Sequence, residues 1–518
     1  MLNYWWVTRP KRKLNSIPEV LSTFAEISLD QEWQGQRDSH LSFEGALEKA
    51  GLKRKGERRD QTGGGARTYR AWVASLGLIF TQESTGKVKL TLAGEAIMNG
   101  DSPVDVLKNQ ILKYQFPSSF SLSRGVQVSQ RFKIRPFRFL LKLLSNSDIS
   151  YLTEEEIAKI IVVEAEDETD KCYEYIVKRV LEFRHKSDSC LEKDFFEKYK
   201  PSRGSVNPGH PFSHLFDLAN TIINWLEYTQ LIKRESRQIS ILEDKIEEVK
   251  SILSNTPAFI DRPDQQEVFQ RKYGLDPKHK KDSRNLTETR TITAQMIAEQ
   301  KIRQVYIGES LKTPISKITP ALVDKITEKT GFDNKLVEET LLRLYPRGSV
   351  GAFMTEYFEM AFKGRDEATE FEKATAELFQ EVFGFESRHV GPIGLTPDVL
   401  ILSDSAGYQA IIDNKAYSKY TISNDHYNRM VHNYIGNLNK YSSSTAPLAF
   451  FTYIAGGFGK NIDTQIKGIA DATGVNGSAM SVSNMIKLVE TYNSSNYDHK
   501  KVKDIFAVNR QIILSDVL

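Results

Sequence analysis

The stretch Pro397–Lys415, PDVLILSDSAGYQAIIDNK, decides the fold of the C-terminal part of the chain. Two β-prone apolar runs flank the turn-forming residues Ser403–Gly407, so the stretch predicts an antiparallel hairpin. Asp398 would begin one strand and Asp413 would end the next. Because Asp413 and Lys415 are two residues apart, an extended strand points both side chains to one side, toward the side that Asp398 also faces. The spacing therefore brings two carboxylates and one ammonium group together.

This set of side chains suits a hard divalent cation. Mg²⁺ takes oxygen ligands, typically one or two carboxylates with water and a substrate phosphate. We expect Asp398 and Asp413 to bind the ion, with the carbonyl of Asn414 as a third ligand, and Lys415 to assist the attacking water or to hold charge on the phosphorus oxygens. Taken singly, an Asp after Pro is a turn former and an Asp-x-Lys pair is a solvated strand end.

Context favours the catalytic interpretation. The runs Gly384–Gly391 (GFESRHVG), Pro397-Asp398 and Ile411–Ser418 (IIDNKAYS) closely resemble the FokI-like cleavage domain of type IIS restriction endonucleases, including its PD-(D/E)XK core. The resemblance covers roughly residues 350 to 490. It implies Mg²⁺-dependent hydrolysis of a phosphodiester that leaves a 5′ phosphate and a 3′ hydroxyl.

The resemblance also implies roles for two helices. The helix expected at Glu367–Phe383 carries Glu372, our candidate for an additional carboxylate at the metal site, with a plain surface glutamate as the alternative. A second helix is expected at Asp425–Asn437. In the resembling domains the corresponding helix forms a dimer and carries an Asp and an Arg one turn apart. An ungapped match places these at Arg429 and Asn433, so the pair is not kept there.

A cluster of basic residues lies near the N-terminus, between Lys53 and Arg70. Seven basic residues against two acidic ones give this segment a charge of +5, and it includes the glycine triplet Gly63–Gly65. Glycine lets backbone amides approach a phosphate, and arginine can reach guanine edges, although a solvated loop has the same composition. The candidate DNA-binding residues are Lys53, Arg54, Lys55, Arg58, Arg59, Arg67 and Arg70.

Helix, hairpin and helix follow one another after this segment. We expect a helix at 68–76, two strands between 78 and 92 and a helix from 93, which is the pattern of a winged helix that binds DNA or protein. The pattern recurs at 219–242. The order of these units resembles the DNA-reading part of AlwI-related and strand-nicking restriction enzymes. Residues 264–303 are charged and poor in apolar side chains, so we interpret them as a solvated linker.

Composition excludes several classes of protein. The 518 residues are 26% charged and 40% hydrophobic, and no window approaches the 18 apolar residues that would span a bilayer. A net charge of +3 excludes a polycation that coats nucleic acid, so any DNA-binding face is local. Two cysteines, Cys172 and Cys190, cannot form a zinc cluster and suggest a reducing compartment, the cytoplasm.

The sequence thus predicts a multidomain α+β protein. We expect two winged-helix-like DNA-recognition domains at 1–145 and 146–290, a helical linker at 291–348, and an α/β PD-(D/E)XK nuclease domain with a central mixed sheet at 349–518.

The predicted function is that of a type IIS restriction endonuclease, which cuts double-stranded DNA at a fixed distance outside an asymmetric site. The predicted partners are a second copy of the chain, bound transiently, and a cognate DNA methyltransferase. The alternatives are a nicking endonuclease or heterodimer subunit, a winged-helix regulator with an inactive nuclease-like domain, and a repair or transposition nuclease.

Overall fold

The computed structural model describes residues 2–54, 63–122, 128–201, 209–235, 237–286, 293–391, 395–495 and 497–518. The chain divides into two compact units. The first comprises Met1–Ile307 and Asp324–Leu344, and the second comprises Gly308–Val323 and Tyr345–Leu518. The finer division into four domains with boundaries at 145, 290 and 348 remains a prediction.

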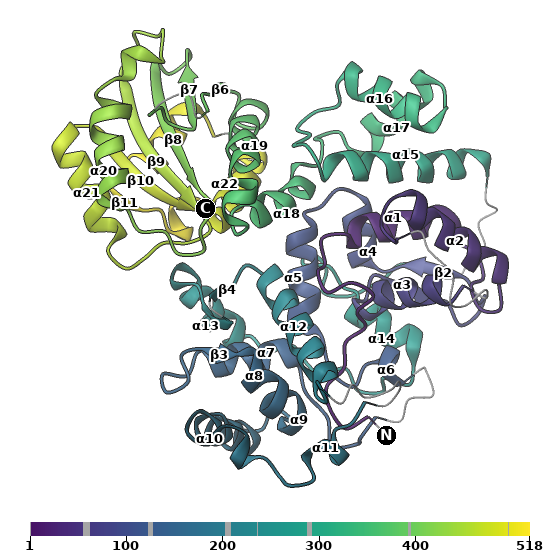
Figure 1. Ribbon diagram of the computed structural model, residues 1–518. Coiled ribbons are helices and arrows are strands. Elements are labelled where there is room, and N and C mark those ends of the chain that lie inside the picture. The colour runs from purple at the N-terminus through teal and green to yellow at the C-terminus, as the bar shows by residue number, and fades with distance from the viewer. Residues whose placement is uncertain are drawn as a thin grey trace. The chain divides into compact units, whose positions relative to one another are not determined.

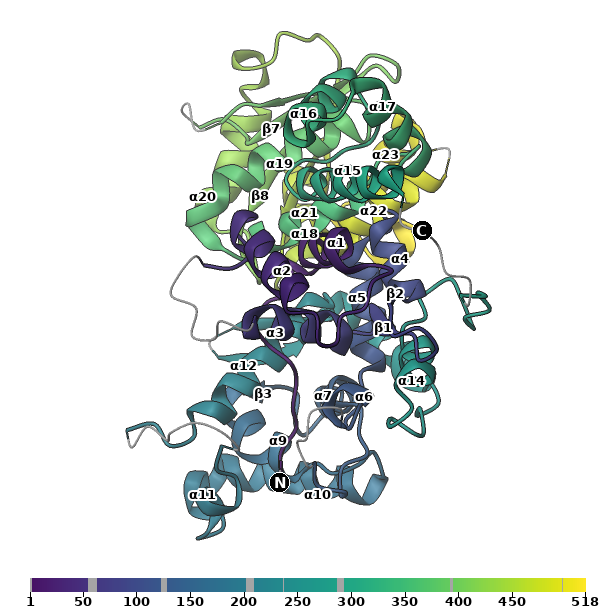
Figure 2. The ribbon, with the colours of Figure 1, turned by 90° about the vertical axis from the view of Figure 1, so that its right-hand side faces the viewer.

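The first unit begins with a three-helix module. Helices α1 (Ile17–Ser28), α2 (Arg37–Lys49) and α3 (Gly64–Ser75) pack side by side, and Figure 2 shows them in the purple part of the ribbon. The antiparallel hairpin of β1 (Ile79–Thr81) and β2 (Val88–Leu90) follows α3 directly. Three helices and a hairpin confirm the predicted winged-helix-like module, although α3 starts four residues earlier than its apolar pattern indicates.

A second module of the same kind lies further along this unit. Helix α12 (Ser213–Tyr228) precedes β4 (Ile232–Glu235) and β5 (Gln238–Ile241), which pair antiparallel, and β3 (Leu152–Thr153) extends the sheet beside β5. Thr153 caps the next helix by a capping box, since its side chain accepts from the Glu156 N–H while the Glu156 carboxylate accepts from the Thr153 N–H.

The interpretation of residues 264–303 as a solvated linker is wrong for both ends of the segment. At its C-terminal end, helix α15 (Ala294–Ser310) buries Ala298 and Ile302. Helix α14 (Gln266–Tyr273) is embedded in the unit, with Phe269 1% and Tyr273 2% exposed. The Gln270 amide donates to the carbonyls of Ala74 and Ile79 at 2.7 and 2.9 Å. This segment contains few apolar residues, but Phe269 and Tyr273 are among them and lie in the core. The low average hydrophobicity of the segment therefore failed to indicate that it is buried.

The second unit is built around a six-stranded mixed sheet in the order β11-β10-β9-β8-β7-β6. Strands β6 (Glu386–His389), β7 (Val399–Ser403) and β8 (Tyr408–Lys415) are antiparallel neighbours. Beyond β8 the strands are parallel. β8 pairs with β9 (Leu448–Ala455), β9 pairs with β10 (Asn476–Ser481), and β10 pairs with β11 (Arg510–Gln511). The hairpin expected around 403–407 is confirmed, and so is the mixed sheet.

Helices cover both faces of this sheet. One face packs against α18 (Val350–Met360), α19 (Ala368–Glu381), α22 (Val482–Ser494) and α23 (His499–Phe506). The other face packs against α21 (Ile462–Thr473), α20 (Asn424–Asn428) and the π-helix Arg429–Ile435 that continues α20. Figure 1 shows α19 and α22 on one side of the strands and α20 and α21 on the other.

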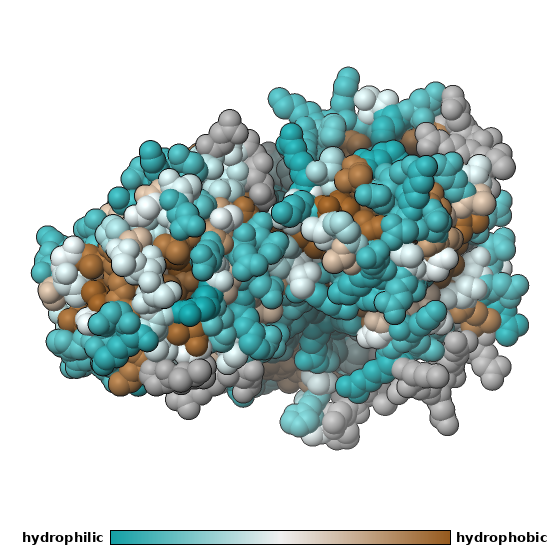
Figure 3. Space-filling model, turned by 90° about the horizontal axis from the view of Figure 1, so that it is seen from above, coloured by the Kyte–Doolittle hydropathy of each residue, from teal (hydrophilic) through white to brown (hydrophobic). Residues whose placement is uncertain are grey.

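The surface is mainly hydrophilic with scattered apolar side chains, as Figure 3 shows for one face. None of the helices in the described ranges is long and apolar enough to cross a membrane.

Candidate active site

The hairpin register brings the predicted catalytic residues together. Val399 pairs with Ile412, so Asp398, one residue earlier, lies beside Asp413, one residue later on the antiparallel strand. The main chain of Asp398 is fixed by its carbonyl, which accepts from the Val390 N–H at 2.9 Å. Asp398 and Asp413 therefore meet because of strand pairing.

The distances in this cluster are short. Lys415 Nζ lies 2.5 Å from Asp413 Oδ2 and 3.9 Å from Asp398 Oδ2. The backbone N–H of Asn414 donates to Asp398 Oδ2 at 2.6 Å. The side chains of Lys415, Asp398 and Asp413 are 14%, 18% and 3% exposed, so these charges interact where water screens them little.

Burial and proximity shift the proton affinities. Burial, followed by the negative charge of Asp413, holds the pKa of Asp398 well above its ordinary value. Burial alone would lower the pKa of Lys415, but the charges of Asp413 and Asp398 outweigh it, and the pKa lies above its ordinary value. A buried site with two acids and one cation favours binding of further positive charge.

The donor set fits a divalent cation. Asp413 Oδ1 is buried and accepts no hydrogen bond from the described residues, which leaves a carboxylate oxygen free to ligate. The side chain of Asn414 faces the opposite side of β8, where its amide donates to Thr375 Oγ1 at 2.6 Å. Of the two carbonyls of Asn414, only the backbone oxygen is near the cluster, since it accepts from Lys415 Nζ at 3.1 Å. The ligand expected from Asn414 is therefore its main-chain oxygen.

Glu372 reaches the site from a different direction. It lies on α19, which covers the face of the sheet opposite to Asp413, and its Oε2 is 2.9 Å from His389 Nε2 on β6. Its charge still raises the pKa of Asp398, as one of the smaller contributions after burial and Asp413. Within the described residues, no three His, Cys, Asp or Glu side chains form a group that could hold one metal ion. Glu372 is thus near the centre but not a third carboxylate ligand in this arrangement.

Two side chains next to the centre were missed by sequence reasoning. Tyr420 Oη lies 2.8 Å from His426 Nδ1, and the negative charge of Asp413 acts on Tyr420. Burial lowers the pKa of His426, and the charge of Lys415 lowers it further. The Lys-Ala-Tyr-Ser run indicated the strand end, but no spacing signal linked Tyr420 to a histidine six residues later on another element.

The predicted dimerisation residues Arg429 and Asn433 both lie on the π-helix. Arg429 Nη2 is 2.8 Å from Asp425 Oδ2, one helical turn earlier, with side-chain exposures of 42% and 64%. An exposed Asp and Arg one turn apart are therefore present, four residues before the positions that the ungapped match gave. A match that allowed a gap would have found them. The dimerisation role of Arg429 and Asn433 stays a prediction.

The basic residues near the N-terminus are only partly described. Lys55, Arg58 and Arg59 lie outside the described residues. Lys53 Nζ is 3.0 Å from carboxylate oxygens of both Glu44 and Glu48, so its charge is compensated within the protein.

The remaining basic candidates, Arg54, Arg67 and Arg70, are described. Arg70 Nη2 donates to Thr81 Oγ1 at 2.8 Å, which ties α3 to β1. Arg67 is half-buried on the first turn of α3 and Arg54 is exposed, and DNA contact by both stays a prediction.

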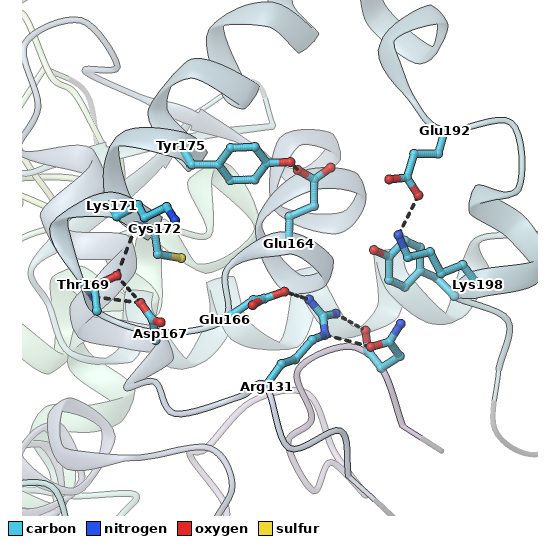
Figure 4. A pocket seen from close by; sticks show the side chains of 12 residues that line it. Arg131, Glu164, Glu166, Asp167, Thr169, Lys171, Cys172, Tyr175, Glu192 and Lys198 are labelled. Atoms are coloured by element: carbon cyan, nitrogen blue, oxygen red, sulfur yellow. Dashed lines mark hydrogen bonds and ion pairs between the residues drawn. The ribbon is translucent and has the colours of Figure 1, made fainter.

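A polar cavity of about 520 Å³ lies elsewhere in the first unit, and its lining residues are drawn in Figure 4. Arg131 Nη1 donates to Glu166 at 2.7 Å, and Lys198 Nζ donates to Glu192 at 2.6 Å. These cations are matched by carboxylates of the protein itself, an arrangement typical of a stabilising ion-pair network. We assign no ligand to this cavity.

Two family models match this chain. The model described as "AlwI restriction endonuclease" matches residues 74–340, just over half of the 518 residues. The model described as "FokI, cleavage domain" matches residues 331–513, which include Asp398, Asp413 and Lys415.

A curated relative and three solved structures are also similar. "Type II restriction enzyme StsI" from Streptococcus sanguinis is 26% identical over 149 residues, which are 26% of this chain and 24% of the relative. The chain thus spans about a quarter of that relative's length. Restriction endonuclease FokI, alone and bound to DNA, is 16% and 15% identical with TM-scores of 0.29, covering 99% of this chain and 100% and 99% of theirs. The BpuJ1 endonuclease binding domain, in complex with modified DNA, is 17% identical with a TM-score of 0.37, covering 52% of this chain and 95% of its own.

Proposed function

Because the chain belongs to the AlwI restriction endonuclease family and carries a FokI-like cleavage domain, we propose that it is a type IIS enzyme. It would bind an asymmetric double-stranded DNA site with its first unit and hydrolyse phosphodiester bonds at a fixed distance outside that site. The observation that carries the proposal is the buried cluster of Asp398, Asp413 and Lys415, in which one carboxylate oxygen of Asp413 accepts no hydrogen bond from the described residues.

Each residue of the cluster has a chemical task in this proposal. Asp398 and Asp413 would hold Mg²⁺, with the main-chain oxygen of Asn414 beside them, and the bound ion would supply Lewis-acid stabilisation of the negative charge on the phosphate. Lys415 orients the water nucleophile and compensates charge on the non-bridging oxygens. The low exposure of all three side chains strengthens these electrostatic interactions.

Cleavage of both strands requires two active centres, and each chain provides one. We therefore propose a transient homodimer through the second unit on DNA, with the exposed Asp425–Arg429 pair on the dimer surface. A dimer contact would also explain why this ion pair sits on a helix whose other side packs against the sheet. A DNA methyltransferase that protects the same site is the expected partner gene product.

Incubation with supercoiled plasmid tests the proposed function. Wild-type protein with Mg²⁺ is expected to give linear DNA whose ends, mapped by run-off sequencing, lie at a constant offset from one short sequence. An EDTA control should leave the plasmid intact. Open circles alone would replace the proposal with a nicking enzyme, and intact plasmid with tight sequence-specific binding would replace it with a DNA-binding regulator.

Arg67 provides a test of the DNA-binding surface. Arg67→Ala should weaken binding to the cognate site about ten-fold, because one arginine contact with a base or phosphate is lost. The slope of log Kd against log salt should also fall by about one if Arg67 contacts a phosphate. Lys53→Ala is the matched comparison, since Glu44 and Glu48 already compensate its charge and its salt slope should stay at the wild-type value. If Arg67→Ala binds the cognate site as tightly as Lys53→Ala does, Arg67 is not part of the DNA interface.

A further inference from the structure

His389 and Glu372 form a hydrogen-bonded pair at the edge of the active centre. His389 Nε2 lies 2.9 Å from Glu372 Oε2, and the two side chains are only 23% and 16% exposed. The pair joins β6 to α19, two elements that pack closely in the second unit. A bond between partly buried charged or polar groups holds the carboxylate in one orientation.

The sheet connects this pair to the catalytic strand. His389 pairs with Val399 in the register of β6 and β7, and Val399 directly follows Asp398. The residue after His389 donates its backbone N–H to the Asp398 carbonyl. Gly391 has φ of +74° and lies so near that an added Cβ would be 3.3 Å from the His389 ring. The ring therefore lies against the backbone at Gly391, two residues later in the chain.

Glu372 lies near the active centre, but it is too far from Asp398 and Asp413 to bind the same metal ion directly. It lies about one helical turn before Thr375 on α19, and Thr375 Oγ1 accepts from the side-chain amide of Asn414, the neighbour of Asp413, at 2.6 Å. The described residues nevertheless contain no set of three such side chains able to hold one ion. Mg²⁺ usually keeps several of its water molecules, and a carboxylate at this intermediate range can accept hydrogen bonds from them.

We propose that His389 is a positioning residue that holds Glu372 as an outer carboxylate, which binds the water shell of the metal ion at Asp398 and Asp413. This inference rests on the proposed function, since it presupposes a metal at that centre. Outer partners of this kind typically change metal affinity 10–100-fold, because they orient what the inner ligands bind.

Metal binding and cleavage, measured on the full-length chain, test this role. Mn²⁺ affinity is measured by titration calorimetry without DNA, and the Mg²⁺ dependence of plasmid cleavage is measured separately. His389→Ala and Glu372→Gln should each weaken Mn²⁺ binding by about 10-fold or more and raise the Mg²⁺ concentration for half-maximal cleavage similarly. His389→Gln, which keeps a donor in this region, should recover part of the loss. His185→Ala is the matched control, because His185 is exposed on α10 (Asp170–Lys186) of the first unit.

The outcomes separate this inference from the proposed function. Wild-type Mn²⁺ affinity in His389→Ala would overturn the positioning role. The role would also be overturned if His389→Gln keeps the wild-type Tm in EDTA but loses as much Mn²⁺ affinity as His389→Ala. If His389→Ala does not fold, His389→Gln and Glu372→Gln carry the test, and wild-type Mn²⁺ affinity in Glu372→Gln overturns it. Wild-type protein that neither binds Mn²⁺ nor cleaves DNA would instead remove the proposed function itself.

Discussion

Asp413→Ala is expected to lower DNA cleavage by at least about 10³-fold while specific DNA binding stays nearly unchanged. The side chain is 3% exposed, and its Oδ1 is the carboxylate oxygen that no described hydrogen bond occupies. Removing it takes away a proposed metal ligand and the main partner of Lys415. Single-turnover cleavage and binding in Ca²⁺ give the two quantities.

Two further variants make the Asp413 result interpretable. Asp413→Asn keeps the shape of the side chain and should be as inactive as the alanine variant, because charge rather than volume is required. Asp404→Ala, an exposed aspartate of the turn between β7 and β8, should retain wild-type rates. An Asp413→Asn protein that cuts at near wild-type rate would remove Asp413 from the catalytic assignment.

Lys415→Met should destabilise the metal-free protein by roughly 3 kcal/mol at neutral pH, because it leaves two buried carboxylates without their cation. For a unit of this size, that corresponds to a Tm lower by about 6–12 °C. The lysine's raised pKa means that its stabilising charge is fully present at neutral pH. Calorimetric scans in EDTA measure the difference.

The pH dependence of this loss has a definite sign. The folded-state pKa of Asp398 lies above the ordinary value of 3.8, so its ionisation opposes folding as pH rises through the folded-state pKa. When the carboxyl is protonated, Lys415 no longer has an anion at Asp398 to compensate. The deficit of Lys415→Met should therefore shrink as pH falls through the folded-state pKa of Asp398. Lys419→Met, at an exposed position, is the control, and a deficit that does not change with pH would contradict the account.

Local patterns predicted much of the second unit. The hairpin at Asp398 and Asp413 follows from alternation and turn chemistry, which act over a few residues, and the structure places both strands as expected. The helix expected at Glu367–Phe383 is observed at Ala368–Glu381. Residues that are close in sequence and periodic in polarity are the ones for which these rules work.

Contacts between distant segments could not be predicted in this way. The pairing of His389 with Glu372 depends on how α19 packs on β6, and no local period encodes it. The burial of Tyr273 depends on a cavity formed by helices more than a hundred residues earlier, where its hydroxyl donates to the Gln110 carbonyl at 3.0 Å. The side-chain direction of Asn414 follows from strand alternation, but the sequence pattern does not distinguish its two carbonyl oxygens as ligands.

The division of the chain into two units bears on any attempt to transplant the nuclease onto another DNA-binding protein. The backbone passes from the first unit to the second after Ile307, returns at Asp324 and leaves again after Leu344. A fragment that starts at Tyr345 would lose Ile315, whose carbonyl accepts from the Ser349 N–H at 2.8 Å within the second unit. A fragment that starts at Gly308 would carry residues 324–344 away from the unit to which they belong. No single cut therefore frees an intact catalytic module, and a portable version requires residues 308–323 to be retained and a short bridge to replace 324–344.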